Sequence, residues 1–339
     1  MAKPPLLCVE DLTVEFPTRR GLLTAVDRVS FELSEGEVLG VVGESGAGKS
    51  LTGAAVIQLL EPPGRIAGGA VTLEGQRIDR LRGEALRRVR GGKIGMIFQD
   101  PLTSLNPLLT VGRQLSETIR THRPMRQAKA REQALGLLHE VGIPAAERRI
   151  DHYPHQLSGG MRQRIVIALA LAAKPRLVIA DEPTTALDVS IQAQITALLK
   201  RLCREQGTAV ILITHDMGVI AETAGRVAVM YAGRIVEIGP VQEVVKRARH
   251  PYTRGLMGAI PKVGGSKVGG ALDRLTQIPG SMPRLTAIPP GCAFNPRCGE
   301  AFDRCRAAPR PELTAAGNSR AACWLYAPEA REEREAAHD

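Results

Sequence analysis

The segment with the clearest chemical potential is a glycine-rich loop that ends in lysine and serine. Residues 43–50 read GESGAGKS and match G-x-x-x-x-G-K-[ST] at every fixed position. The glycines let backbone N–H groups converge on phosphate oxygens, and the helix that follows presents the positive end of its dipole to the same anion. Lys49 can reach the β- and γ-phosphates, and the Ser50 hydroxyl can ligate Mg²⁺. The loop alone predicts a nucleoside triphosphate site, which kinases and GTPases share.

A pair of carboxylates follows a short apolar run later in the chain. Residues 177–182 read LVIADE, and ligands in open α/β sheets bind beyond the carboxyl ends of the strands. Asp181 is therefore predicted to hold Mg²⁺ through water, and Glu182 to orient and deprotonate an attacking water. An acidic pair that merely caps a strand exit is the alternative for this segment taken alone.

A second potential anion-binding helix start lies at residues 157–163, LSGGMRQ. Ser158 is a good N-cap residue, and the exposed amides of a helix start attract anions. The chain thus contains two helix starts suited to phosphate. If both serve one nucleotide, they must come from different chains or from distant parts of one chain.

The surrounding pattern predicts a largely parallel, helix-covered sheet. Continuous apolar runs, typical of strands covered on both faces, occur at residues 37–42, 176–180 and 209–214. Alternating or β-branched segments that predict further strands, the last two forming a hairpin, are 6–16, 26–33, 70–74, 93–98, 227–231 and 234–238. Helices are expected at about 49–60, 190–205 and 217–224, with a mostly helical stretch between residues 100 and 157.

Composition limits the classes of protein that the chain could represent. Its 339 residues are 44% apolar, yet no apolar run reaches the roughly 18 residues of a membrane span. No secretory signal is visible, so the six cysteines are expected to be thiols or metal ligands in a reducing compartment. The net charge of +10 is concentrated in the C-terminal third. A basic face could meet nucleic acid, an anionic membrane or only solvent, and no aromatic interleaving favours nucleic acid.

Taken together and in this order, the motifs resemble those of the nucleotide-binding subunit of ATP-binding cassette (ABC) transporters, over about residues 6–245. LSGGMRQR is similar to the family's signature, usually LSGGQ, with Met161 in place of Gln. Gln99 in IFQDP, residues 185–188 (TALD) and His215 in LITHD resemble its Q-loop, D-loop and switch histidine. The resemblance implies an α/β ABC-type nucleotide-binding domain over 1–247. Its parts are a P-loop core sheet, an antiparallel β subdomain and a helical subdomain at about 100–157, and a cysteine-containing extension follows at 248–339.

In that family two cassettes pack head to tail around two ATP molecules, and the matching positions imply roles here. Glu182 is the expected general base, with Gln99 and His215 completing the catalytic set. Mg²⁺ is expected at Ser50, Gln99 and Asp181. The expected ATP-binding residues are Phe16, Gly43, Ser45, Gly46, Ala47, Gly48, Lys49, Ser50 and Leu51. The signature residues expected to reach the partner's nucleotide are Ser158, Gly159, Gly160, Met161 and Gln163. Asp188 is the expected D-loop aspartate.

Four of the cysteines gather near the C-terminus, at Cys292, Cys298, Cys305 and Cys323. Four soft thiolates suit zinc or an iron–sulfur cluster. The absence of C-x₂-C pairs weakens the zinc interpretation. Four unconnected buried thiols, or disulfides, are the remaining alternatives. Cys8 and Cys203 are isolated and are expected to be packing residues.

Several segments narrow the resemblance to dipeptide and oligopeptide importer ATPases. They are HPYTRGLM (250–257), IPGSMPRL (278–285), PPGCAFNPRCGEAFDRC (289–305), FQDPLTSLNP (98–107) and YPHQLSGGMRQR (153–164). Some members of that subfamily carry a [4Fe–4S] cluster on four such cysteines, which favours this cluster here, with zinc as the alternative.

The same resemblance implies a function: ATP hydrolysis that energises import of dipeptides or oligopeptides, by a peripheral subunit at the cytoplasmic face of the inner membrane. The implied partners are a second, different ABC ATPase subunit, two membrane permease subunits and an extracytoplasmic peptide-binding protein, with no nucleic acid. Import of nickel, glutathione or a glycoside, or a soluble non-transport ABC ATPase, are the alternatives. The LSGGM helix and His215 argue against a phosphate-loop kinase.

Overall fold

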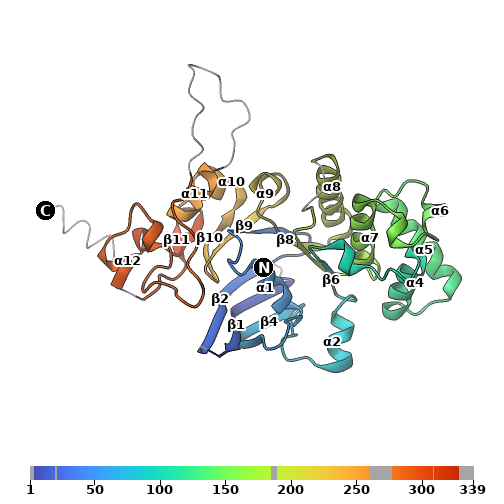
Figure 1. The fold of residues 1–339 in the computed structure, drawn as a ribbon, viewed down its shortest axis with the longest axis horizontal. Coiled ribbons are helices and arrows are strands. Elements are labelled where there is room, and N and C mark those ends of the chain that lie inside the picture. The colour runs from blue at the N-terminus through green and yellow to red at the C-terminus, as the bar shows by residue number, and fades with distance from the viewer. Residues whose placement is uncertain (1–3, 20, 185–188, 260–276, 308, 328–339) are drawn as a thin grey trace, which may run out of the picture.

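The computed structural model describes residues 4–19, 21–184, 189–259, 277–307 and 309–327. Within these residues an eight-stranded sheet forms the centre of the molecule (Figure 1), in the order β11-β12-β10-β9-β3-β8-β7-β6. Five neighbouring strands of this sheet are parallel: β9 (Arg226–Tyr231), β3 (Val38–Val42), β8 (Ala209–Ile213), β7 (Leu177–Asp181) and β6 (Ile94–Ile97). The antiparallel hairpin partner of β9 is β10 (Arg234–Pro240).

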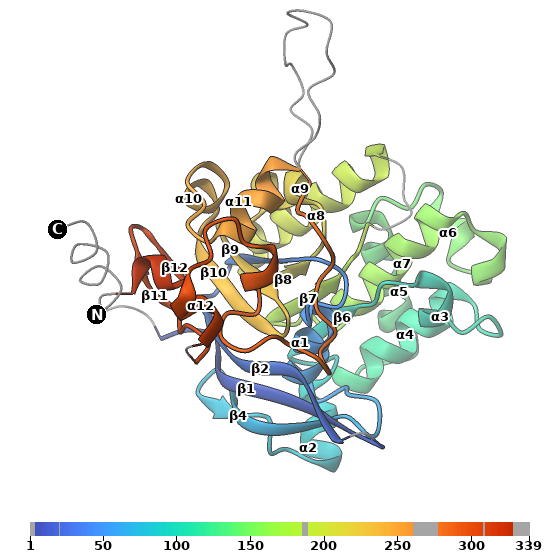
Figure 2. The same cartoon turned by 60° about the vertical axis from the view of Figure 1, so that its left-hand side comes forward.

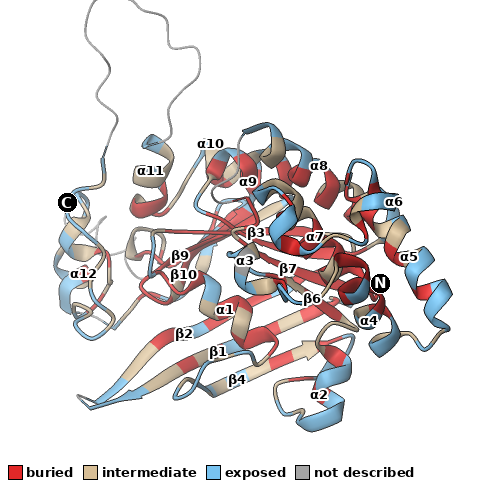
Figure 3. Cartoon of the chain, turned by 45° about the vertical axis from the view of Figure 1, so that its right-hand side comes forward, coloured by how far each residue is buried: buried red, intermediate tan, exposed pale blue. Residues whose placement is uncertain are grey.

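The central strands are buried on both faces because each alternates between two cores. On β7, Leu177 and Ile179 belong to the core shared with the antiparallel sheet, whereas Val178 and Ala180 belong to the core shared with the helices. All five residues of β3, β7 and β8 are buried, as the red interior of Figure 3 shows. This confirms the prediction drawn from the continuous apolar runs.

A second, antiparallel sheet in the order β2-β1-β4-β5 covers one face of the central sheet. Its strands are β1 (Leu7–Thr18), β2 (Gly21–Leu33), β4 (Arg65–Leu73) and β5 (Gln76–Arg77). Helix α1 (Lys49–Val56) contacts strands of both sheets, and α2 (Gly83–Val89) precedes β6. The sequence pattern predicts a longer first helix, to residue 60. The helix ends early because Gln58 adopts a left-handed backbone conformation, with φ of 55°.

Helices cover the other face and one end of the central sheet. Beyond the β6 edge lie α3 (Pro101–Ser104), α4 (Val111–His122), α5 (Gln127–Glu140), α6 (Ala146–Arg149) and α7 (Gly159–Leu171). The helices nearer β8 and β9 are α8 (Val189–Gln206), α9 (Met217–Thr223) and α10 (Val241–Lys246). Thr110 caps α4 by accepting a hydrogen bond from the Arg113 N–H, and Leu115, Ile119 and Leu138 pack between α4 and α5 in a buried core.

The C-terminal residues pack against the β9–β10 side of the central sheet (Figure 2). They contain α11 (Pro251–Gly258), α12 (Asp303–Ala307), β11 (Thr314–Ala316) and β12 (Ser319–Ala321). Strand β12 pairs with β10 through Glu237 opposite Ala321 and Ile238 opposite Arg320. The C-terminal residues therefore add two strands, β12 and β11, to the edge of the central sheet beyond β10. No helix in the described part of the chain is both long and apolar enough to cross a membrane.

Candidate functional site

The phosphate loop lies between the end of β3 and the start of α1, as its sequence context predicts. Its curvature requires glycine: a Cβ on Gly43, whose φ is 151°, would lie 2.3 Å from the Met230 carbonyl oxygen. Gly48 has a φ of 100°, and a Cβ there would lie 3.0 Å from the Ala25 carbonyl oxygen. The Lys49 ammonium is buried and donates to the carbonyl oxygens of Gly43, at 2.9 Å, and Glu44, at 3.1 Å. The lysine thus lies across the loop that would surround a phosphate chain.

Charged groups of both signs meet beside the loop. The Ser50 hydroxyl donates to a carboxylate oxygen of Asp181 at 2.9 Å. Burial raises the pKa of Asp181, and the neighbouring Glu182 raises it further against the opposing hydrogen bond from Ser50. Burial also lowers the pKa of Lys49. The negative charges of Glu182 and Asp181 partly offset this lowering. A hydroxyl and a carboxylate in direct contact are hard oxygen ligands of the kind Mg²⁺ prefers.

Glu182 is held between two other residues predicted to act in catalysis. Gln99 Nε2 donates to Glu182 Oε2 at 3.1 Å, and His215 Nδ1 lies 3.4 Å from Glu182 Oε1. The three residues follow β7, β6 and β8, whose carboxyl ends share one edge of the sheet. The sheet therefore brings Gln99, Glu182 and His215 together beside the Ser50–Asp181 pair. Their catalytic roles remain predictions.

The signature segment forms the capped, exposed start of α7. Ser158 is the N-cap, and its hydroxyl accepts a hydrogen bond from the Met161 N–H at 3.4 Å. Ser158 and Gly159 are exposed, Gly160 is half-buried, and Met161 packs against the helical core. An exposed helix start can present its amides to a second molecule.

Gln163, which is predicted to act in the partner's nucleotide site, is buried within its own chain. Its side chain is 2% exposed, and Nε2 donates to the Pro183 carbonyl at 2.7 Å. Gln163 lies five residues after the N-cap, on the inner face of α7. Its hydrogen bond connects this helix to Pro183, the residue after Glu182. Its position in the structure is therefore that of a buried structural residue.

Two other predicted residues lie away from these contacts. Phe16 is half-buried near the end of β1, and its ring packs against the backbone of Gly64. Asp188 and the rest of residues 185–188 lie outside the described residues.

The four C-terminal cysteines line one small pocket, together with His250, Phe294 and Trp324. Burial raises the pKa of Cys292 to about 11 and of Cys323 to about 12, and neighbouring thiols of the group contribute to both shifts. Within the described residues, no set of three or more His, Cys, Asp and Glu side chains converges as ligands of a single metal ion.

Two N–H donors at the pocket are buried without an acceptor. His250 is 1% exposed, and its Nδ1 accepts from the Tyr252 N–H at 3.1 Å, which places the imidazole proton on Nε2. Among the described residues, neither His250 Nε2 nor Trp324 Nε1 has a hydrogen-bond partner. Buried donors without partners are costly and rare in folded proteins. Both residues line the pocket that the four cysteines share.

Sequence reasoning did not identify the C-terminal residues that contact the phosphate loop. Arg297 donates to the Glu44 carboxylate, the Tyr252 hydroxyl accepts from the Glu44 N–H, and Met282 lies against Gly46. All three C-terminal residues fall inside segments noted for their resemblance, but no pattern in those segments predicts contact with the phosphate loop.

Comparisons with known proteins match both parts of the chain. The family model described as "ABC transporter" matches residues 26–185, and the model described as "Oligopeptide/dipeptide transporter, C-terminal region" matches residues 236–305. A peptide import ATP-binding protein of Brucella abortus (strain 2308) is 47% identical over 319 residues, which are 94% of each chain. A similarly named protein of Brucella ovis is 48% identical over 92% of this chain and 94% of its own length.

Solved structures give the same result for the fold. The ATP-binding cassette MJ0796, determined as a dimer in a post-hydrolysis state with ADP and Pi, superposes with a TM-score of 0.64 at 30% identity, covering 69% of this chain and 98% of that one. The cbiO1 protein of Clostridium perfringens, part of the transporter complex cbiONQ, gives 0.62 at 28% identity over 72% and 92% of the two chains.

Proposed function

The chain belongs to the ABC transporter family, and from that premise we propose that it is the ATP-hydrolysing subunit of an importer of dipeptides or oligopeptides. The observation that carries the proposal is the convergence of Gln99, Glu182 and His215 beside the Ser50–Asp181 pair and the phosphate loop. The relatives named for peptide import span nearly the whole chain, which supports the substrate class. We divide the chain accordingly into a cassette, 1–247, and an importer-type extension, 248–339.

The arrangement supports hydrolysis by a positioned water. Glu182 accepts a proton from the water, whose oxygen attacks the γ-phosphorus, and the bond to the bridging oxygen of ADP breaks to release phosphate. His215 and Gln99, each on one carboxylate oxygen, orient Glu182 for this step. Ser50, Asp181 and Gln99 would hold Mg²⁺, which neutralises phosphate charge when bound. The loop amides and Lys49 bind the phosphates.

The exposed start of α7 would complete the site of a second cassette. Ser158, Gly159, Gly160 and Met161 would contact the γ-phosphate bound by the partner, so ATP stabilises the closed pair and ADP does not. We propose that the partner is a different ABC chain. We further propose that the complex contains two permease subunits, one of which contacts the helical region of this chain at about 100–157. This contact would place the chain at the cytoplasmic face of the membrane, and an extracytoplasmic binding protein would deliver the peptide.

Reconstitution tests this function. The chain, its companion ATPase and the permease subunits are placed in liposomes, and ATP turnover is measured with a binding protein that is empty or loaded with a short peptide. We expect the peptide-loaded protein to stimulate turnover. Stimulation by nickel, glutathione or a glycoside in place of peptide would overturn the substrate class while leaving the ATPase in place.

We also propose that the four cysteines hold a [4Fe–4S] cluster. A cluster binds each thiolate to a different iron, whereas zinc requires all four sulfurs at one point. The four thiols line one pocket, which supports a site that all four share. The unpaired donors of His250 and Trp324 suit its anionic sulfurs. When bound, the cluster would supply a covalent link between the four segments that carry the cysteines.

Metal analysis tests the cluster. Protein purified without oxygen should be brown and contain about four irons per chain, and Cys305→Ser should lose that colour. Cys8→Ser is the matched control, because Cys8 lies on β1 with Glu32 as its recorded contact. Stoichiometric zinc without visible absorption would reject the cluster.

A further inference from the structure

A turn of the C-terminal extension contacts the phosphate loop directly. The Arg297 side chain is 7% exposed, and its Nη1 lies 3.1 Å from each carboxylate oxygen of Glu44. Glu44 is the second residue of the loop GESGAGKS. The same guanidinium donates to the Tyr231 hydroxyl at 3.3 Å and, through Nε, to the Pro279 carbonyl at 2.8 Å. With the Gly280 carbonyl, which accepts from Nη2 at 3.4 Å, four residues fix this arginine in one position, and this favours a specific role over a passing surface contact.

Two further contacts connect the extension to the same loop. The Glu44 N–H donates to the Tyr252 hydroxyl at 2.9 Å, and a Cβ on Gly46 would lie 3.1 Å from the terminal methyl of Met282. The Glu44 carbonyl accepts from Lys49. The extension therefore holds the side chain and the N–H of Glu44, while the phosphate-binding lysine holds its carbonyl. A shift of the extension must move a residue that Lys49 contacts.

The turn that carries Arg297 is fixed by the four-cysteine pocket. Cys292 precedes it and Cys298 follows it directly, and the Cys292 N–H donates to the Cys305 carbonyl at 2.9 Å. Phe294, within the turn, packs against the rings of Tyr231, Tyr252 and His250 at centroid distances of 5.3, 5.5 and 5.8 Å. The position of the guanidinium thus depends on a turn whose two ends are cysteines of one site.

We propose that Arg297 is a positioning residue for the phosphate loop, through which the metal-bound state of the four-cysteine site sets the affinity for ATP. The pair with Glu44 holds the loop in the conformation that receives phosphate, so the nucleotide does not have to order it on binding. Release of the cysteines frees the turn and removes that constraint. The inference deepens the proposed function, since it assumes ATP binding at this loop.

The contact between Arg297 and Glu44 is tested by measuring the nucleotide affinity of the full-length protein. The dissociation constant of a fluorescent ATP analogue is measured for Arg297→Met and for the matched control Arg306→Met. Arg306 lies in the same extension but is 58% exposed and pairs with Asp303 on its own helix. We expect Arg297→Met to weaken binding roughly tenfold and the control to bind as the wild type does, with iron content unchanged in both. Wild-type affinity in Arg297→Met would overturn the proposal.

A double-mutant cycle tests the link to the cysteines. Cys305→Ser, which removes a metal ligand, should weaken binding in the wild-type background and have no further effect in Arg297→Met, because the contact is already lost. Fully additive losses would overturn the link. If Arg297→Met does not fold, Glu44→Gln replaces it as the partner variant of the same pair. A wild-type chain that binds no ATP would instead refute the proposed function, so the two failures are distinguishable.

Discussion

Glu182 adopts a left-handed backbone conformation, with φ of 45°, which residues other than glycine seldom take. Its N–H donates to the Ile213 carbonyl, and its two carboxylate oxygens face Gln99 and His215. Such strain persists only where the surroundings fix it and is concentrated at functional sites. The sequence predicted Glu182 because it follows an apolar strand, and Gln99 and His215 because their segments resemble the family's Q-loop and switch histidine. The contacts of the three residues with one another follow only from the strand order.

Replacement of Glu182 by Gln should separate catalysis from binding. The amide keeps the shape of the side chain but cannot take the proton of the attacking water, so we expect steady ATP turnover to fall by about 100-fold or more. The dissociation constant for ATP should stay within roughly threefold of wild type, since Lys49 and the loop amides are untouched. A coupled ATPase assay and equilibrium binding measure the two quantities.

The control for this change is Glu84→Gln on α2, an exposed glutamate whose recorded pairs are with arginines of its own helix. Its turnover should equal that of the wild type. Undiminished turnover in Glu182→Gln would remove this residue from the role of base.

Gln163 shows how a structural contact can compete with a role predicted from sequence. Proximity to the signature suggested a role in binding the partner's nucleotide, but the helical period turns this residue inward to the Pro183 carbonyl. We expect Gln163→Ala to lower the free energy of unfolding by about 1–3 kcal/mol, because a buried carbonyl loses its donor. Urea denaturation measures this loss. Gln76→Ala, an exposed change on β5, should stay within about 0.5 kcal/mol.

A different result would restore the original prediction for Gln163. If Gln163→Ala keeps its stability and loses only ATP-dependent pairing with the partner cassette, the side chain acts across the interface after all.

At the scale of elements, long apolar strands were predictable and short C-terminal ones were not. The runs that form β3, β7 and β8 are buried on both faces and leave a clear pattern. In contrast, β11 and β12 have three residues each, too few for any periodicity. β12 is a strand because the open edge of β10 offers it hydrogen bonds, and β11 pairs in turn with β12.

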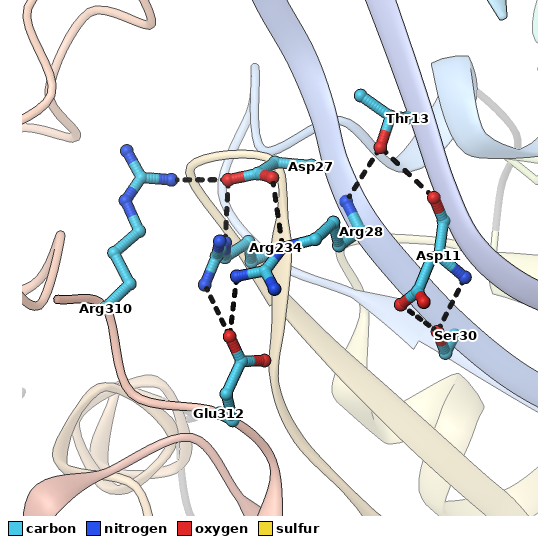
Figure 4. Close-up of polar contacts among 8 residues, drawn as sticks. All are labelled: Asp11, Thr13, Asp27, Arg28, Ser30, Arg234, Arg310 and Glu312. Atoms are coloured by element: carbon cyan, nitrogen blue, oxygen red, sulfur yellow. Dashed lines mark hydrogen bonds and ion pairs between the residues drawn. The ribbon is translucent and has the colours of Figure 1, made fainter. Parts of the chain in front are cut away.

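A charge network joins this region to the antiparallel sheet (Figure 4). Asp27 on β2 accepts from Arg234 Nε at 2.7 Å and from Arg310 Nη1 at 3.0 Å, and Glu312 pairs with Arg28 at 2.6 Å. Burial lowers the pKa of Arg310, as does the nearby charge of Arg234. Asp27 is thus the carboxylate that offsets two guanidinium groups, neither of them more than a quarter exposed.

Asp27→Asn should loosen the extension. A neutral amide leaves the charges of Arg234 and Arg310 without their shared counterion, which we expect to destabilise the packed extension by about 2 kcal/mol. Limited trypsin digestion, followed by intact mass, should then show faster cleavage after Arg320, on β12 of the extension, than in the wild type. Asp303→Asn is the control, since Asp303 is fully exposed. Equal cleavage rates in the two variants would show that the network does not hold the extension.

Across the whole molecule, the extension contacts a loop far away in sequence. Arg297 and Glu44 are separated by 253 positions, and no local pattern in either segment predicts that they meet. The sequence did predict two helix starts suited to phosphate, one at Lys49 and one at Gly159. The second helix start, at Gly159, is exposed in the structure. A site shared between two chains requires such an exposed start, because the partner's nucleotide must reach it.

The shared site predicts assembly that depends on the nucleotide. Glu182→Gln with Mg²⁺ and ATP should form a pair with its companion cassette, detected as a doubled mass by light scattering, whereas ADP should leave both chains single. Gly159→Arg should prevent pairing, because an arginine there would occupy the interface. A Cβ on Gly159 meets nothing within 4 Å in the isolated chain, so the substitution should leave folding and single-chain ATP binding intact.

Gly136 on α5 offers the matched control for that substitution. It is also exposed, and its Cβ would likewise meet nothing within 4 Å, but it lies within α5 and not at the α7 start. Gly136→Arg in the Glu182→Gln background should therefore pair as well as its parent. Equal pairing of both arginine variants would mean that the α7 start is not in the interface. Both variants add one arginine at an exposed glycine, and only Gly159 is predicted to lie in the interface. Loss of pairing in both variants would therefore point to a general effect of the added charge.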